Sequence, residues 1–294
     1  MRITDGMLHD QALAGLQTNI EALSRIQEQV STSKRLVRPS DNPADVQSAL
    51  KARDGIAALE QHVRNVSTAQ RSVEAADTEL GAAGEIVQRA RELAIQGAND
   101  TLSPTDRASM AAEVEQLARQ LVAHAGAKVG DQYLFSGFKT DTAPYTEAAP
   151  GSAAVSAYAG DNGAIVARIA PGSSMTVNVT ADTVFGPALA ALAQMHQELV
   201  AGTTVSGGTI ALIDSGQAAV LSGRAQIGAR ANRLAETQLT LEGTILTARQ
   251  LISNIEDVDM AAAITELNER EAVYQAALAV NARIIQPSLI DHLR

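Results

Sequence analysis

Apolar residues near the start of the chain recur at alternating spacings of three and four. The positions are Leu13, Leu16, Ile20, Leu23 and Val30, with Gln27 occupying one place in the series. So narrow a stripe is typical of a coiled-coil seam, because a helix packed on a globular core shows a wider apolar face. The pattern predicts a helix that runs to about Leu36 and pairs with another helix.

The helical pattern resumes after Pro43 and is much longer. Its apolar positions are Leu59, Val63, Val66, Val73, Ala76, Leu80, Val87, Ala90 and Leu93. About fifty residues at ~1.5 Å each give a helix roughly 75–80 Å long. Helices in globular domains are far shorter, so the sequence predicts a rod.

A helical hairpin is expected at the end of this rod. Gly97 suits a helix C-terminus, while Ser103, Pro104 and Asp106 fit an N-cap, a first helical position and an acidic third position. The next helix carries Val114, Leu117, Leu121 and Ala125.

The composition changes from about Lys139, where Gly, Pro, Ser and Thr become frequent. Short alternating stretches at 165–170 and 175–180 are typical of strands. Asn162–Gly163 is a hairpin-turn signal, because both central turn positions need positive φ. We expect a β insertion over residues 139–186.

Helix returns with "PALAALAQMHQELVAG" and, after a glycine-rich break, runs from about Thr209 to Pro287. Seam positions repeat every seven residues at Leu234, Leu241, Ala248, Ile255 and Ala262, with Ile245 and Ile252 in the alternate positions and Leu267, Tyr274 and Leu278 further on. Because both ends of the chain are heptad helices, the first helix is expected to pair with the last.

The predicted fold is mainly α with a small β insertion, in three layers. A terminal coiled-coil layer comprises 1–42 with 250–294, a helical rod layer comprises 43–138 with 187–249, and the inserted β domain is 139–186. The predicted assembly seam consists of Leu13, Leu16, Ile20, Leu23, Ile252, Ile255, Leu278 and Ile285.

Between the first two helices lies a polar cluster, Pro39, Ser40, Asp41, Asn42 and Pro43. The oxygens of Asp41, Asn42 and Asp45 could bind a cation, or the cluster could be a joint between helices. Proline disfavours helix at the residue before it, so Pro39 is expected to close the first helix. Asn is a good N-cap and Pro a good first helical residue, and this favours the joint.

Composition narrows the function. Aromatics make up 2% of the chain, Trp and Cys are absent, and the formal net charge is -10. Without a basic excess, neither nucleic acid nor an anionic membrane surface is an expected partner. The lack of Cys excludes disulfides and thiolate metal sites. The N-terminus does not resemble a cleaved secretory signal, and no apolar run reaches the ~20 residues of a membrane span.

Catalytic and cofactor motifs are not found. There is no glycine-rich phosphate loop, and no two histidines share a metal-binding helix spacing. Glu256, Asp257 and Asp259 could form an acid/base pair, but a solvated helix face is the favoured interpretation. We expect no cofactor, no metal and no enzyme activity.

Several blocks resemble one known family. "KRLVRPSDNPADVQSALKAR", "LSPTDRASMAAEVEQLARQL" with "GDQYLFSGFKTDTAPY", and "RAQIGARANRLAE" with the C-terminal helix occur in the order found in the bacterial flagellar hook-associated protein 3 family of the flagellin superfamily. The resemblance covers roughly residues 1–145 and 220–294. Asn42 departs from the family's Asp, which changes little because both residues cap helices.

This resemblance implies a structural subunit at the junction between the flagellar hook and the filament. It implies self-assembly, contact with the first hook-associated protein and with flagellin, an export chaperone, and an extracellular location reached through the flagellar export apparatus. A flagellin filament subunit is the nearest alternative, and a cytoplasmic coiled-coil adaptor is an alternative of a different class. Tyr133–Gly137 and the Pro39–Pro43 cluster resemble the junction protein more than flagellin.

Overall fold

The computed structural model describes residues 5–146 and 151–291, and at residues 5, 6, 8, 9 and 283–291 it describes the backbone alone. The chain is mainly α-helical with a small β insertion, as predicted. It divides into two compact units. One comprises residues 1–58 and 244–294, and the other comprises residues 59–243.

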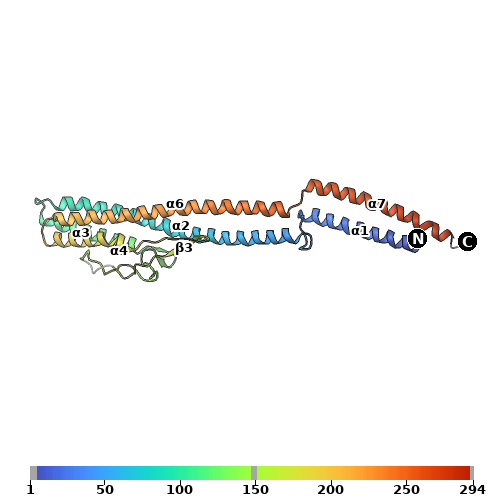
Figure 1. The fold of residues 1–294 in the computed structure, drawn as a ribbon. Coiled ribbons are helices and arrows are strands. Elements are labelled where there is room, and N and C mark those ends of the chain that lie inside the picture. Colours follow the sequence, from blue (N-terminus) through green and yellow to red (C-terminus); the bar gives the residue numbers. More distant parts are fainter. Residues whose placement is uncertain (1–4, 147–150, 292–294) are drawn as a thin grey trace. The chain divides into compact units, whose positions relative to one another are not determined.

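The two terminal helices pair in the first unit, as the heptads predicted. α1 (Asp5–Thr32) and α7 (Met260–Asp291) lie side by side (Figure 1). α1 ends at Thr32 rather than near Leu36, because Ser33 adopts the left-handed conformation with φ of 55°. The expectation that Pro39 closes this helix is therefore wrong.

The prediction of one continuous C-terminal helix is also wrong. α6 (Gly207–Glu256) stops before residues 257–259, and α7 begins at Met260. Asp259 starts the new helix, because its carboxylate accepts from the backbone N–H groups of Ala261 at 2.9 Å and Ala262 at 3.2 Å. The backbone of α7 continues past Pro287, so this proline does not end the helix.

The rod and hairpin follow the predicted pattern. α2 (Pro43–Gly97) is 55 residues long, and α3 (Pro104–Ala125) follows after a short turn. The Ser103 hydroxyl accepts from the Asp106 N–H, and the Asp106 carboxylate accepts from the Ser103 N–H, each at 3.2 Å. This reciprocal pair is a capping box and fixes the start of α3.

The described residues form two small antiparallel hairpins. β1 (Lys128–Val129) pairs with β2 (Gln132–Tyr133), ahead of the predicted insertion, and β3 (Val166–Ala170) pairs with β4 (Ser173–Thr176). The turn between β3 and β4 passes through Gly172, with φ of 71°.

The prediction of a hairpin turn at Asn162–Gly163 is wrong, because these residues do not connect paired strands. The Asp161 carboxylate accepts from the Gly163 N–H at 2.9 Å and from the Phe138 N–H at 2.7 Å, which ties two loops together. A Cβ at Gly163 would lie 2.2 Å from the Phe138 ring. Glycine is needed here for close packing against an aromatic ring and not for positive φ.

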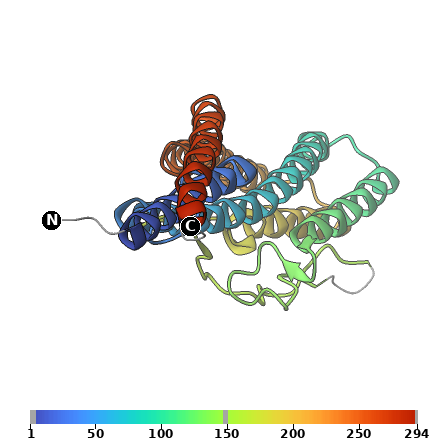
Figure 2. The ribbon, with the colours of Figure 1, turned by 90° about the vertical axis from the view of Figure 1, so that its right-hand side faces the viewer.

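The core of the second unit lies among α2, α3, α5 (Gly186–Val200) and α6. Two of the three phenylalanines, Phe135 and Phe185, are fully buried with edge-to-face rings 5.0 Å apart. Phe185 follows the short α4 (Ala181–Val184). The loops and strands of the insertion lie against one side of these helices (Figure 2).

Candidate functional site: paired helix breaks

The break after α1 and the break after α6 bind each other through their backbones. Lys34 and Asp257 form an isolated antiparallel bridge. The Arg35 N–H donates to the Glu256 carbonyl at 2.6 Å, and the Val258 N–H donates to the Ser33 carbonyl at 3.2 Å. Each break therefore satisfies backbone groups that the helix ends of the other leave free. We call residues 33–35 and 256–258 the paired breaks.

A cluster of ionic side chains surrounds the paired breaks. The Lys34 ammonium lies 2.5 Å from the Asp257 carboxylate and 3.5 Å from that of Glu256. The Arg53 guanidinium lies 2.6 Å from the same Glu256 carboxylate. Glu256 is only 6% exposed, so its buried charge is compensated by two cations. The interpretation of this segment as a solvated helix face is wrong for Glu256.

Arg35 links three elements at the joint. Its guanidinium lies 2.8 Å from the Asp45 carboxylate, in the first turn of α2, and donates to the Ile255 carbonyl at 2.6 Å. The Ile255 carbonyl belongs to the last turn of α6, where a cation is favourable because the helix dipole is negative there. The Arg35 carbonyl accepts from the Gln29 side chain of α1 at 3.0 Å.

The predicted joint, Pro39 to Pro43, lies between these contacts and α2. The Asp41 carboxylate accepts from the N–H groups of Val37 at 3.2 Å and Arg38 at 2.8 Å, which turns the chain before Pro39. The Asn42 side chain accepts from the Asp45 N–H at 3.3 Å, and Pro43 is the first residue of α2. Pro39 and Ser40 are exposed.

Two pKa values at the paired breaks follow from this geometry. The hydrogen bond from Lys34 lowers the pKa of the Asp257 carboxyl, and a hydrogen bond from the Ser253 hydroxyl adds to this effect. The hydrogen bond to Asp257 raises the pKa of the Lys34 ammonium. Both groups are therefore held in their charged forms across the neutral pH range.

The predicted seam residues fall into two groups. Leu16, Leu23, Ile252 and Ile255 are half-buried. Leu13, Ile20 and Leu278 are 46%, 47% and 44% exposed. The side chain of Ile285 lies outside the described residues.

Sequence reasoning missed Ile26, which is 6% exposed, while Gln27 is exposed. Ala12, Asn19 and Ile26 are spaced by seven, and none of them is exposed, whereas Leu13, Ile20 and Gln27 are exposed. Leu16 and Leu23 thus stay in the covered stripe of α1, and Ala12, Asn19 and Ile26 take the alternate positions that the prediction gave to Leu13, Ile20 and Gln27. The spacing of Ile26 relative to Leu16 and Leu23 was the available signal.

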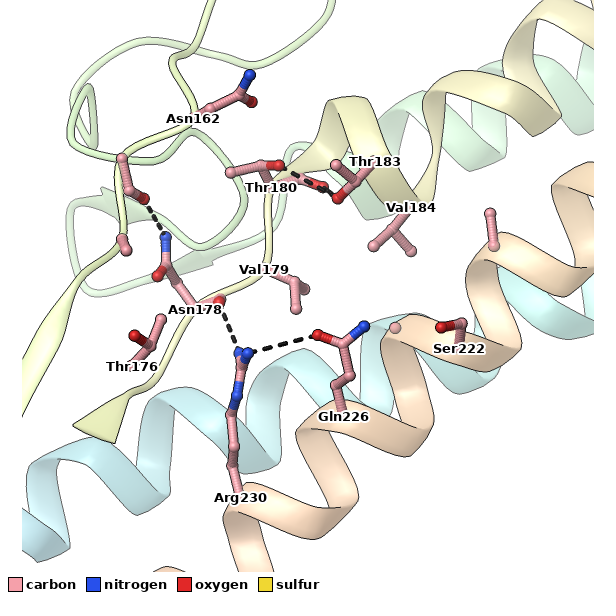
Figure 3. Close-up of a pocket in the computed structure, with 14 residues that line it drawn as sticks. Asn162, Thr176, Asn178, Val179, Thr180, Thr183, Val184, Ser222, Gln226 and Arg230 are labelled. Atoms are coloured by element: carbon pink, nitrogen blue, oxygen red, sulfur yellow. Dashed lines mark hydrogen bonds between the residues drawn. The ribbon is translucent and has the colours of Figure 1, made fainter.

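The second unit holds a small hollow of about 330 Å³ between the insertion and α6 (Figure 3). Its polar groups bind one another. The Arg230 guanidinium donates to the Asn178 carbonyl at 2.6 Å, and the Asn178 side chain bonds the backbones of Gly163 and Ile165. Burial lowers the pKa of Arg230. This arrangement attaches the insertion to α6, and it uses the Arg230 guanidinium for that attachment.

Among the described residues, no group of three or more His, Cys, Asp or Glu side chains is placed to hold a metal ion. Within the same residues, none of the helices combines the length and apolar character that crossing a membrane requires.

Comparison with known proteins identifies the family of this chain. The family model of the bacterial flagellin N-terminal helical region matches residues 3–140, and that of the bacterial flagellin C-terminal helical region matches residues 210–293. The chain belongs to the flagellin family. The flagellin-family regions contain α1, α2, α3, α6 and α7, and both sides of the paired breaks. The segment between the two matched regions holds β3, β4, α4 and α5.

Individual relatives include hook-associated proteins and flagellins. The chain is 26% identical to flagellar hook-associated protein 3 of Escherichia coli (strain K12), over 94% of this chain and 95% of that protein. It is 24% identical to a flagellin of Listeria innocua, over 100% of this chain and 99% of that protein. The solved flagellar junction protein FlgL of Legionella pneumophila has the same fold, with a TM-score of 0.60 and 18% identity over 71% of this chain and 100% of that one.

Proposed function

We propose that this protein is a structural subunit of the bacterial flagellum that forms the junction between the hook and the flagellin filament. The observation that carries the proposal is the similarity to hook-associated protein 3 over nearly the full length of both chains. The flagellin of Listeria innocua matches over the whole of this chain at a lower identity, so a filament subunit is the second candidate.

Exposed apolar side chains on the terminal helices support an assembly role. They include Leu13 and Ile20 on α1, and Ile264, Val273, Leu278 and Val280 on α7. Each of them is about half exposed, so covering one contributes on the order of 1 kcal/mol, and a neighbouring subunit gains by covering several. The proposed assembly seam thus combines half-buried residues that join α1 to α7 with exposed residues that meet the next subunit.

We propose a different role for each of the three layers of the chain. Residues 1–42 with 250–294 form the terminal layer, 43–138 with 187–249 form the rod, and 139–186 form the insertion. The Pro39–Pro43 cluster and the paired breaks join the terminal layer to the rod. A subunit in a tube meets its neighbour through two different surfaces, and such a contact continues until another protein ends it.

The proposed partners follow from this position. They are further copies of this chain, the first hook-associated protein on the hook side, flagellin on the filament side, and an export chaperone before assembly. We propose that the chain works outside the cell without a cleaved signal peptide and has no enzyme activity.

Deleting the gene in the source bacterium tests the proposal. A junction protein predicts hooks of normal length, no filaments, and flagellin released into the medium. Supplying the gene in trans should restore filaments. If the deletion strain lacks the major filament protein itself and releases no flagellin, the chain is a flagellin and the proposal is wrong.

A further inference from the structure

A groove of about 630 Å³ in the second unit lies between α2, the β1–β2 hairpin and β3. Its floor is the α2 surface from Asn65 to Ala76, and Tyr133 forms part of one wall. Such a volume is in the usual range of about 300–1,000 Å³ for binding pockets. It is distinct from the terminal helices and from the paired breaks.

One wall of the groove is the free edge of strand β3. The Ile165 carbonyl accepts from Val177, and its N–H donates to the Asn178 side chain, so Ile165 bonds toward the chain that continues β4. Backbone direction alternates along a strand, so the N–H and C=O of Val166 point the other way. No hydrogen bond to either group is found among the described residues. Val166 is 57% exposed.

α2 holds this edge in place. The Arg168 carbonyl, which shares the outward direction, accepts from the Asn65 side chain at 3.1 Å and lies 3.4 Å from His62 Nδ1. These contacts occupy the last carbonyl of the edge and leave Val166 open. An unpaired strand edge is a template for another extended chain.

The charges of the groove have one sign. Its charged lining residues are Arg71 and Arg168, and no Asp or Glu among the described residues lines it. Neither guanidinium forms an ion pair within the described residues, and the Arg71 side chain bonds the Thr68 hydroxyl at 3.2 Å. Nearby, the Lys128 ammonium lies 4.2 Å above the Tyr133 ring. This is notable on a chain whose formal net charge is -10.

We propose that this groove binds an extended, acidic segment of a partner protein, which adds as a strand to the free edge of β3. Backbone pairing at Val166 gives the segment its direction. Carboxylates at alternate positions of the segment face one side, since strand side chains alternate, and bond Arg71 and Arg168. Peptide recognition by strand addition combines main-chain bonds with side-chain selection in the same manner.

A labelled, end-capped peptide tests the proposal. In this peptide Glu alternates with Val over about seven residues, which is long enough to span the edge at ~3.3 Å per residue. Fluorescence anisotropy with the full chain should show binding that weakens as salt is added. Arg71→Gln with Arg168→Gln should weaken it about tenfold or more, because charge-assisted bonds are lost. Arg64→Gln is the matched control, since Arg64 lies on α2 outside the groove and bonds Gln61, and it should bind as the parent does.

Strand addition is tested separately from charge. Val166→Pro removes the outward N–H and leaves the β3–β4 ladder intact, so it should weaken peptide binding while circular dichroism and thermal unfolding stay unchanged. The same peptide methylated on alternate backbone nitrogens should not bind, nor should a Lys-for-Glu version. Equal binding of the methylated peptide overturns the proposal, and so does undiminished binding by the double arginine variant. Self-association of the chain through this groove without peptide binding also overturns it.

Discussion

At the scale of single residues, Glu256 lies at the centre of the ionic cluster around the paired breaks. It lies at the end of α6, is almost fully buried, and accepts from Arg53. A buried carboxylate needs its cations, because removing one partner leaves an uncompensated charge. Lys34 and Arg53 come from two other segments, so a single side chain ties three parts of the first unit together.

Glu256→Gln should loosen the paired breaks. The amide keeps the size of the carboxylate but loses its charge, and charge-assisted hydrogen bonds contribute about 1.5–3 kcal/mol each when well buried. Amide hydrogen exchange should become faster at Arg35 and Val258, whose N–H groups bond across the breaks. Glu242→Gln is the matched control, because Glu242 is an exposed residue of the same helix. Unchanged exchange at both amides would count against the role of Glu256.

The Lys34–Asp257 ion pair should make the stability of the paired breaks depend on pH in two ranges, one acidic and one basic. The lowered pKa of Asp257 means that its contribution is complete above the ordinary value of 3.8 and is lost as the pH falls through the lowered value. The raised pKa of Lys34 means that its contribution is complete below 10.5 and is lost as the pH rises through the raised value.

The protection of the paired-break amides, taken relative to the intrinsic exchange rate at each pH, should therefore be greatest between these limits. Asp257→Asn should remove the dependence on acid, while Asp54→Asn, at an exposed position of α2, should preserve it. An acid limb that persists in Asp257→Asn would show that another group is responsible.

At the scale of elements, close packing between α6 and its neighbours depends on glycine. A Cβ at Gly216 would lie 2.7 Å from the Ala188 Cα of α5, whereas a Cβ at Gly228 would meet nothing within 4 Å. Both residues are in α6, so they form a matched pair that separates packing from helix propensity.

Gly216→Ala should lower the stability of the second unit by about 1–3 kcal/mol, the usual effect of overpacking, despite the better helix propensity of Ala. Gly228→Ala should raise it by roughly 0.5–1 kcal/mol. Chemical unfolding followed by circular dichroism measures both. A stabilising Gly216→Ala would contradict the packing of α5 against α6.

The elements also show what sequence predicts well. Heptads, caps and prolines gave α2, α3 and the pairing of the terminal helices, because these signals are local or periodic. The paired breaks were not predictable in this way, since Lys34 and Asp257 are 223 residues apart along the chain. Ser33 and Asp257 carry no strong helix-breaking signal by themselves. The bonds between the two breaks, together with the Asp259 cap of α7, stabilise this arrangement. Asn162–Gly163 has the sequence of a local hairpin turn, but its glycine is required by a tertiary contact with Phe138, which local sequence does not reveal.

At the scale of the whole molecule, the fold separates what is satisfied within one chain from what is left for neighbours. In the first unit, Ile26 and Ala263 are buried, while apolar side chains elsewhere on α1 and α7 stay exposed. A flagellin-family chain with such exposed stripes is suited to assembly, and assembly supplies the missing burial.

The double substitution of Leu13 and Ile20 by Ser should separate assembly from folding. Both side chains are nearly half exposed, so the isolated chain should stay folded and lose little thermal stability. Cells that carry this variant in place of the parent chain should lack filaments, because the proposed contact between neighbouring subunits loses two apolar side chains. Leu239→Ser is the control, since this exposed leucine of α6 lies outside the terminal layer. Normal filaments in the double variant would refute this assignment of the seam.

The most direct test of the proposed function is the position of the chain in the flagellum. Immunogold labelling of intact hook–filament complexes, with an antibody to this chain, should place gold in a single narrow band where the hook meets the filament. Gold along the full length of the filament would identify a flagellin instead. Complexes without gold, with the chain retained inside the cell, would contradict a structural role in the flagellum altogether.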